Sequence, residues 1–407
     1  MTDQALARAA VQAVREHGSI IAAAKATGIP RHTLSNRLAQ AVVAGIAEPA
    51  AGGDIALARV KAEVRELRAK LGKAHATTIE AEDVRATILG LAKEPASPPA
   101  WLVGKRNRTG TTGVPVTMWA DWHIGETVNP AEVNYVNEFN LAVAEKRIRR
   151  LVERTIDLAK GHMTNPDYPG IVVALMGDMV TGEIHDELAQ TNDLDLLPSV
   201  LWTRDRLIWA LERMADEFGR VFVPAVSGNH GRNTKRLQAK RFAAKNFDWL
   251  IYCLLERYFK ERGDKRVVIH APEVNEVRFD VYGHRFLALH GHDLGVKGGD
   301  GIIGALGPIM RGQMKVSTSQ AQIGRDFDTL LIGHWHQELW LSRVICANTL
   351  KGYDEFARAF LRAGFSLPSQ PLFFVHPRHG ITARWDVLLE DREYHGPRPW
   401  AAWEAKA

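Results

Sequence analysis

The sequence predicts an α/β body with a small all-helical module in front of it. Short apolar runs such as IVVALMGD and VFVPAVSGNH end in glycine and polar residues, as buried strands often do. Amphipathic runs with helical period, at 139–161 and 200–219, lie between such strands. This alternation of strand and helix indicates an α/β fold. The first 45 residues contain three short helical patterns instead.

The composition is that of an ordinary globular protein. The chain has 407 residues, of which 46% are hydrophobic and 24% charged, so we expect two or more domains. It has no run of eighteen apolar residues, which predicts no membrane span. The N-terminal segment is amphipathic and lacks an apolar signal core. Two cysteines, Cys253 and Cys346, provide no disulfide framework, so a cytoplasmic location is expected.

The positive charge is concentrated at the front of the chain. Residues 1–75 contain 11 Lys and Arg against 6 Asp and Glu, an excess equal to the net charge of +5. A basic module joined to a neutral body suggests contact with a polyanion. The alternative is a well-solvated helical surface.

Punctuating residues divide the first 45 residues into three helices. The apolar residues of the first pattern share one face: Leu6, Ala9, Ala10, Val11 and Val14. Gly18 ends this helix, and Ser19 caps a second one that runs to Thr27. Gly28 provides the turn, and Pro30 suits the first position of a third helix.

This stretch resembles the helix-turn-helix of DNA-binding regulators. Small Ala24 lies four residues before the turn glycine Gly28, where the helices must approach closely. The expected buried anchors are Ile20, Ile29, Leu34 and Leu38. The resemblance implies that the third helix enters the major groove of DNA. Its candidate contact residues are Arg31, His32, Thr33, Ser35, Asn36 and Arg37. A small helical bundle that contacts protein is the alternative.

The segment between the module and the body combines linkers with one helical pattern. A heptad-like seam runs through the predicted helix at 54–75, with apolar residues spaced three, four, three and four: Leu57, Val60, Val64, Leu67 and Leu71. This helix could pair two chains in a homodimer or lie on the body. We therefore divide the chain into a module at 1–45, a linker with a helical segment at 46–110, a body at 111–395 and a tail at 396–407.

Five polar clusters follow apolar strands in the body. They are Asp121 with His123, Gly177-Asp178, Gly228-Asn229-His230, His290-Gly291-His292, and Gly333-His334-Trp335-His336. A single cluster of this kind is more often a satisfied loop than a site. Five in one chain indicate a site, because polar residues at strand ends gather along one edge of an α/β sheet. Imidazole and carboxylate groups together suit Mn²⁺, Fe or Zn²⁺.

The ordered set D-x-H, G-D, G-N-H, H-G-H and G-H-x-H resembles the calcineurin-like metallophosphoesterases over residues 116 to about 390. The resemblance implies a β-sandwich flanked by helices and two divalent ions, with Mn²⁺ expected first and Fe, Zn²⁺ or Mg²⁺ as alternatives. It also implies two ligand sets, which are Asp121, His123 and His336 for one ion, and Asn229, His290 and His334 for the other. Asp178 would bridge both ions, and the pair would activate the water that attacks phosphorus.

The resemblance also implies a general acid, His230, which protonates the leaving oxygen. The family often has an acid directly after G-N-H, but here Gly231 and Arg232 follow. Either another carboxylate orients His230, with Asp186 as a candidate, or the histidine works without one.

Two further residues are expected near the substrate. His292 would face the phosphate or support the ligands, and Arg232 opens a basic run. That run contains Arg232, Lys235, Arg236, Lys240, Arg241 and Lys245. It would attract a phosphodiester backbone, or it is a solvated helix face.

Three functions fit these observations. The first is a metal-dependent DNA nuclease that the module targets. The second is a phosphatase or small phosphodiesterase with a regulatory helix-turn-helix, and the third is a non-enzymatic DNA-binding protein with a relic body. The complete ligand set argues against the third, and the basic front of the chain favours the first. The arrangement is also similar to phosphoesterases encoded by phages and prophages.

Overall fold

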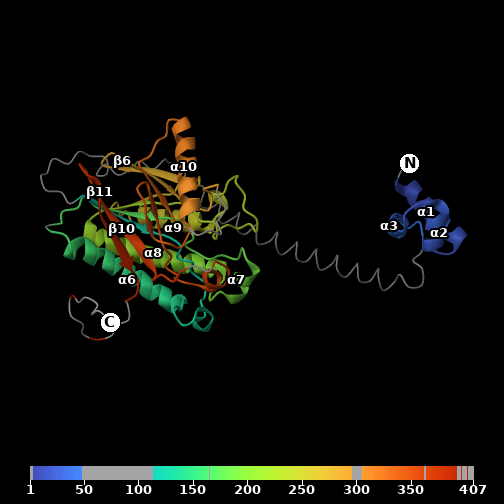
Figure 1. Cartoon of the computed structure of the whole chain (residues 1–407), viewed down its shortest axis with the longest axis horizontal. Coiled ribbons are helices and arrows are strands. Elements are labelled where there is room, and N and C mark those ends of the chain that lie inside the picture. Colours follow the sequence, from blue (N-terminus) through green and yellow to red (C-terminus); the bar gives the residue numbers. More distant parts are fainter. Residues whose placement is uncertain are drawn as a thin grey trace, which may run out of the picture. The chain divides into compact units, whose positions relative to one another are not determined.

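The computed structural model describes residues 3–47, 113–164, 166–295, 305–361, 364–391, 396 and 401. Its contacts divide the chain into two units, Met1–Ala86 and Thr87–Ala407, which are described separately (Figure 1). Within the described residues, no helix is both long and apolar enough to cross a membrane. The predicted helix at 54–75 and most of the predicted linker segment, residues 48–110, lie outside the described residues.

The first unit contains the three predicted helices, α1 (Asp3–His17), α2 (Ile20–Thr27) and α3 (Arg31–Val43). Ser19 caps α2, because its hydroxyl accepts a hydrogen bond from the N–H of Ala22 at 3.2 Å. Gly28 adopts φ 68°, which glycine accepts most readily, and turns the chain into α3. Leu34 is fully buried, as predicted, whereas the other three expected anchors are partly buried.

Three details of this unit differ from the prediction. On α1, Ala9 is exposed and Ala7 is buried instead, because the buried face is rotated by part of a turn. In α2 the fully buried small residue is Ala23, while Ala24 is partly buried. Pro30 precedes the first helical residue of α3, where its extended backbone accommodates the entry of the chain.

The body contains two sheets. The first has six strands in the order β11-β10-β1-β2-β3-β4, and β1 to β4 run parallel. Its strands are β1 (Val114–Trp119), β2 (Ile171–Leu175), β3 (Val221–Pro224), β4 (Val267–His270), β10 (Ser369–His376) and β11 (Gly380–Leu388). β10 pairs with β1 and β11 in antiparallel register.

The second sheet has five strands in the order β5-β6-β7-β9-β8. They are β5 (Glu276–Val281), β6 (His284–Leu289), β7 (Thr329–Ile332), β8 (Leu339–Trp340) and β9 (Val344–Cys346). The three central strands β6, β7 and β9 are parallel, while β5 and β8 are antiparallel edge strands.

The described part of the body contains five α-helices, and the four long ones pack on the outer faces of the sheets. The five are α6 (Leu141–Gly161), α7 (Asp186–Thr191), α8 (Leu196–Phe218), α9 (Phe247–Glu261) and α10 (Leu306–Gln322). Short helical turns lie at Pro130–Val133, Ala243–Lys245 and Ala357–Leu361. α6 and α8 lie side by side along one face of the body, and α10 lies on the opposite side (Figure 1).

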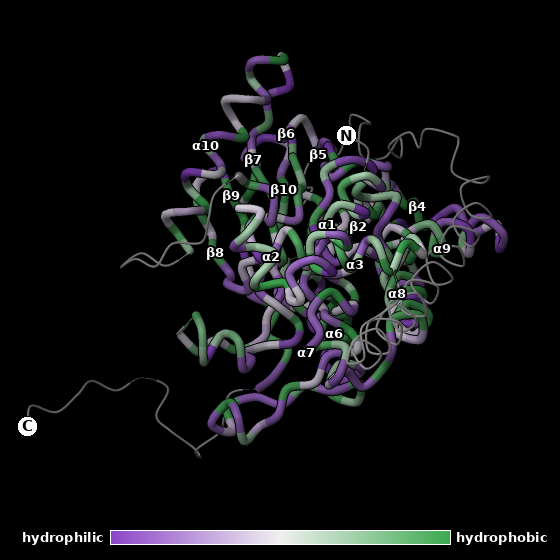
Figure 2. The backbone as a smooth tube through the Cα atoms, turned by 90° about the vertical axis from the view of Figure 1, so that its right-hand side faces the viewer, coloured by the Kyte–Doolittle hydropathy of each residue, from purple (hydrophilic) through white to green (hydrophobic). Residues whose placement is uncertain are grey.

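Alternating side chains of the strands build a layered core. Val173 and Val223, for example, face the helices α6, α8 and α9, while their neighbours Val172 and Phe222 face the second sheet. The outer face of the second sheet packs on α10. Hydrophilic and hydrophobic stretches alternate along α6 and α8 (Figure 2), as one-sided burial requires. The α/β class predicted from the sequence is confirmed, with two mixed sheets packed between helices.

Candidate metal centre

The predicted polar clusters meet because parallel strands present their carboxyl ends at one edge. In the first sheet, Asp121, Asp178 and Asn229 follow β1, β2 and β3. In the second sheet, His290 and His334 follow β6 and β7. A hydrogen bond joins the two edges, since the N–H of His334 donates to Oδ2 of Asp121 at 2.9 Å.

Six of the seven predicted ligands form two trios. The first trio is Asp121, His123 and His336, and the second is Asp178, His290 and His334. Within each trio, one potential ligand atom per residue lies within 4.8 Å of the others. Each trio combines one carboxylate with two imidazoles, a donor set that suits Mn²⁺, Fe or Zn²⁺.

The seventh predicted ligand, Asn229, contacts the second trio. Its Oδ1 lies 3.2 Å from Nε2 of His290, and this nitrogen lies 3.0 Å from Oδ2 of Asp178. The sequence favoured His290 over His292 as the ligand, and the structure places His290 in the trio. The bridging role of Asp178 stays a prediction.

The backbone at these positions is strained. Among the described residues, nine non-glycine residues have a positive φ, and five of them belong to the trios. These five have φ between 49° and 70°: Asp121, His123, Asp178, His334 and His336. Non-glycine residues in this region cost free energy, and such residues concentrate at functional sites. The strain is consistent with side chains that are held in place for a ligand.

Two glycines leave room for the carboxylates. A Cβ on Gly228 would lie 2.0 Å from Oδ1 of Asp178, and one on Gly333 would lie 2.5 Å from Oδ2 of Asp121. The glycines in G-N-H and G-H-x-H therefore have a steric reason to be there.

A buried acid, Asp248, accepts hydrogen bonds from the backbone around Asp178, the predicted bridging ligand. Its Oδ2 accepts hydrogen bonds from the N–H groups of Asp178 and Gly228, both at 2.8 Å, and its Oδ1 accepts one from Met179 at 3.1 Å. Burial, together with the charge of Asp178, raises the pKa of Asp248 to about 7. The sequence analysis missed this residue, although an acid inside the apolar run NFDWLIY was a usable signal.

His230 is oriented by a backbone carbonyl. Its Nδ1 lies 3.1 Å from the carbonyl oxygen of Thr181, and its N–H donates to Oδ1 of Asp178 at 2.7 Å. The candidate Asp186 is wrong as the orienting acid, because it is exposed and pairs with Lys235 at 2.5 Å. Since a carbonyl only accepts hydrogen bonds, the Nδ1 of His230 carries the proton that it donates.

The acid that the family often has after G-N-H would not fit in this chain. A Cβ on Gly231 would lie 2.6 Å from Oδ1 of Asn246 and 3.0 Å from Oδ1 of Asp248. Asn246 is fully buried and donates to the carbonyl of Gly228 at 2.6 Å. The space beside Gly231 is therefore filled by the groups that hold the preceding loop.

Arg232 braces its own loop. Its guanidinium donates to the carbonyl oxygens of Asn229, Thr234 and Lys235 at 2.5, 2.9 and 3.1 Å. Its predicted contact with substrate gains no support from these bonds, which leave the guanidinium engaged with the chain itself.

His292 lies beside the second trio. Its ring stacks on Phe242 with centroids 5.0 Å apart and lies 5.5 Å from the ring of His290. Whether it supports the ligands or faces a phosphate stays a prediction.

The basic run after His230 is a loop and not a helix face. Bends and turns extend from 233 to 242, followed by the short turn Ala243–Lys245. Lys235, Arg236, Lys240 and Arg241 are exposed in this loop. The helical alternative for this run is therefore wrong, because the chain folds back to begin α9 at Phe247.

The electrostatics of the trios divide the histidines into two kinds. Burial, assisted by the nearby Lys351, holds the pKa of His123 well below its usual range, and burial also lowers that of His334. Neutral imidazole is the form that binds metal. For His290, burial is outweighed by the charge of Asp178, which raises the pKa to about 10. Metal binding at the second trio would displace this proton.

The predicted DNA-contacting residues are accessible on α3. Arg31, His32, Ser35 and Asn36 are exposed, and Thr33 and Arg37 are half-buried. The only buried position between Arg31 and Arg37 is Leu34, which faces the core of the first unit.

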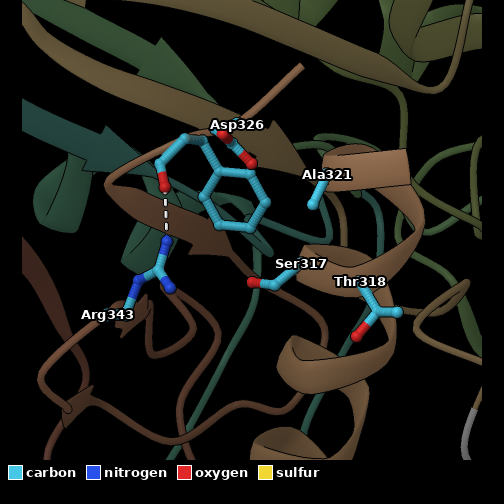
Figure 3. Close-up of a pocket in the computed structure, with 6 residues that line it drawn as sticks. Ser317, Thr318, Ala321, Asp326 and Arg343 are labelled. Carbon is cyan, nitrogen blue, oxygen red and sulfur yellow. Dashed lines mark hydrogen bonds between the residues drawn. The ribbon is translucent and has the colours of Figure 1, made fainter. Parts of the chain in front are cut away.

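A pocket elsewhere in the body contains none of the trio residues. It is lined by Ser317, Thr318, Ala321, Asp326, Phe327 and Arg343 (Figure 3). The guanidinium of Arg343 donates to the carbonyl oxygen of Phe327, so part of its hydrogen-bonding capacity is already used within the chain. We therefore place the candidate site at the trios.

Two comparisons of the sequence with known proteins gave no match. No protein-family model matches the chain. A search of curated proteins likewise found no match. The function is therefore inferred from the residues and their geometry.

Proposed function

We propose that this protein is a phosphodiester hydrolase with two divalent metal ions, and that it is a DNA nuclease targeted by its N-terminal helices. The observation that carries the proposal is the meeting of two trios, each with one carboxylate and two imidazoles, at adjacent strand ends. The ordered motifs of the sequence resemble the calcineurin-like metallophosphoesterases, and the layered two-sheet body is compatible with that resemblance.

The trios would hold one ion each, with Asn229 added to the second and Asp178 shared between them. Bound divalent ions supply Lewis acidity to the phosphoryl group and lower the pKa of water. The protein supplies strained, pre-positioned ligands, so little reorganisation is needed on binding. Mn²⁺ is the first choice, and Fe, Zn²⁺ and Mg²⁺ are the alternatives.

His230 would protonate the leaving oxygen through Nε2. Because Nδ1–H donates to the carbonyl of Thr181, Nε2 is the nitrogen left to exchange a proton, and it can donate one only when the imidazole is protonated on both nitrogens. The bond from the N–H of His230 to Asp178 ties the acid to a metal ligand. A shift of Asp178 would therefore also displace His230, and the reverse.

DNA is the preferred substrate because basic residues occur at two places. The accessible residues of α3 are of the types that contact bases and phosphates. The exposed basic residues at 235–241 follow directly after the loop that bears His230. Both would be attracted to a phosphodiester backbone.

Purified protein with Mn²⁺ should be incubated with labelled single- and double-stranded DNA, with bis-p-nitrophenyl phosphate and with p-nitrophenyl phosphate. The proposal predicts cleavage of DNA and of the diester, abolished by a chelator and restored by Mn²⁺. Asp178→Asn serves as the inactive control. Hydrolysis of the monoester alone would favour a phosphatase, and no hydrolysis of any substrate would favour a binding protein.

A further inference from the structure

A buried ionic cluster lies behind the first trio. Glu126 is 6% exposed and uses both carboxylate oxygens, since Oε1 lies 2.7 Å from Nζ of Lys351 and Oε2 accepts the hydroxyl of Thr181 at 2.6 Å. Lys351, 3% exposed, also pairs with Asp354 at 2.5 Å. Burying three ionised groups is costly unless each is paired, and here each is.

The cluster faces the outer nitrogen of a predicted metal ligand. The Nδ1 of His123 lies 3.4 Å from Oγ1 of Thr181 and 3.6 Å from Oε2 of Glu126. The other nitrogen, Nε2, faces the trio and lies 3.2 Å from Nε2 of His336. The imidazole is therefore held between the trio on one side and the cluster on the other.

The direction of the hydrogen bonds follows from the carboxylate. An ionised Glu126 can only accept, so the hydroxyl of Thr181 donates its proton to Oε2. The oxygen of that hydroxyl is then free to accept from Nδ1–H of His123. A proton fixed on Nδ1 leaves Nε2 with its lone pair directed toward the trio.

Thr181 also contacts the second functional histidine. Its carbonyl oxygen lies 3.1 Å from Nδ1 of His230, so one residue holds the outer nitrogens of both His123 and His230. The rings of these two histidines lie 4.7 Å apart, edge to face. The backbone of Thr181 sets the direction of one ring, and its side chain sets that of the other.

We propose that Glu126, acting through Thr181, is a positioning residue that fixes the tautomer and direction of His123, and that Lys351, which also pairs with Asp354, holds the Glu126 side chain in place. This inference rests on the proposed metal centre. Glu126 and Thr181 were not among the candidate site residues of the sequence, because the contact joins positions 55 residues apart and Lys351 is a further 170 residues along the chain.

The test compares Thr181→Val with Thr181→Ser. Valine keeps the shape of threonine but removes the hydroxyl, whereas serine keeps the hydroxyl, and both retain the backbone carbonyl. Mn²⁺ binding is measured by titration calorimetry at constant pH. Loss of a residue that orients a metal ligand typically lowers affinity by about 10- to 100-fold. We expect this loss in one of two binding steps for Thr181→Val and near wild-type binding for Thr181→Ser.

Two backgrounds assign the affected step. In His334→Ala, which retains the first trio, Thr181→Val should still weaken Mn²⁺ binding. In His336→Ala, which disrupts the first trio, the same change should have little further effect. Glu126→Gln should reproduce the loss, and Glu153→Gln, at an exposed position on α6, should bind like wild type.

The outcomes separate this inference from the proposed function. If wild type binds two Mn²⁺ ions and folded Thr181→Val binds them equally well, the positioning role is wrong and the metal centre stands. A loss that is equal in Thr181→Ser and Thr181→Val would also contradict it, because the hydroxyl would then be irrelevant. If wild type binds no Mn²⁺, the proposed function fails with it.

Discussion

Asp178 and His230 are linked directly, so a ligand and the candidate acid share one local structure. The N–H of His230 donates to Oδ1 of Asp178, and the opposite oxygen of that carboxylate lies 3.0 Å from His290. Each single residue of the centre therefore has a structural contact as well as a proposed chemical role. Substitutions must be chosen so that the two effects can be separated.

His230→Ala offers such a separation. The change removes the imidazole but retains the N–H that donates to Asp178, so we expect both metal ions to stay bound. A general acid contributes about 10²–10⁴-fold, and activated leaving groups need little of it. Hydrolysis of esters with poor leaving groups should therefore fall far more than that of p-nitrophenyl esters. Equal rate losses on both kinds of ester would contradict the acid role.

The strands of the body bring together residues that are far apart in sequence. The glycines at the strand ends allow the connecting loops to approach one another closely. Gly333, directly after β7, has no room for a side chain, since its Cβ would lie 2.5 Å from Asp121 and 3.2 Å from Cβ of Ala120. The close approach of this loop to the end of β1 brings residues of the two sheets into one centre.

Gly333→Ala should push Asp121 out of position. Overpacking of this kind costs about 1–3 kcal/mol of stability. A displacement of about 1 Å near a reacting centre can cost on the order of 100-fold in rate. Gly364→Ala is the control, because nothing lies within 4 Å of its Cβ position. Melting temperature, Mn²⁺ affinity and diester hydrolysis should be measured for both. Unchanged Mn²⁺ affinity in Gly333→Ala would contradict the steric argument.

Glu338 provides a pH test of the packing between β8 and β10. Burial, with the nearby Asp386, raises the pKa of this carboxyl from 4.5 to about 9. The folded protein thus holds a proton that the unfolded chain loses above pH 4.5, so stability falls as pH rises from about 4.5 to 9. Each pH unit in this range lowers the free energy of unfolding by up to about 1.4 kcal/mol.

Glu338→Gln has no proton to lose at this position. Its free energy of unfolding should therefore exceed that of wild type at pH 8, and the difference should shrink toward pH 5. Denaturant titrations of both proteins at several pH values would measure the difference. A constant difference across this range would show that Glu338 is ionised in the folded protein.

The elements also show what the sequence can predict. The strand ends were predictable because each polar cluster directly follows its own apolar strand, so the pattern is local. The residues that hold the ligands in place were not predictable, because they lie far away in the sequence. Asp248 lies 70 residues from Asp178, and Lys351 lies 225 residues from Glu126. Hydrogen bonds to backbone groups, such as that from His230 to Thr181, depend on loop conformation. They cannot be predicted from residue type, because every residue has a backbone carbonyl.

At the scale of the whole molecule, the chain combines a helical unit at the front with a body that contains the centre. The proposed metal ligands all lie in the body, whereas residues 1–75 contain the excess of basic residues. Under the proposed function, this distribution would separate binding of DNA from hydrolysis. It predicts that the two activities can be lost independently.

Deletion of residues 1–45 should weaken DNA binding and leave hydrolysis of bis-p-nitrophenyl phosphate unchanged. Contacts to phosphates release counterions, so the affinity of the full chain should fall more steeply with salt than that of the truncated protein. Replacing Arg31 and Arg37 with alanine should reproduce part of the loss, because both lie on the accessible part of α3. Identical salt slopes and affinities would mean that the front helices contact protein instead.

In the proposed centre, one carboxylate, Asp178, joins two metal ions. Crystals grown with Mn²⁺ should show two anomalous difference peaks about 3.5–4 Å apart, one in each trio and both next to Asp178. Crystals of Asp178→Asn should lose most of this signal, together with nearly all hydrolysis. Two peaks of full height in an active Asp178→Asn protein, or no peak at either trio in wild type, would contradict the account.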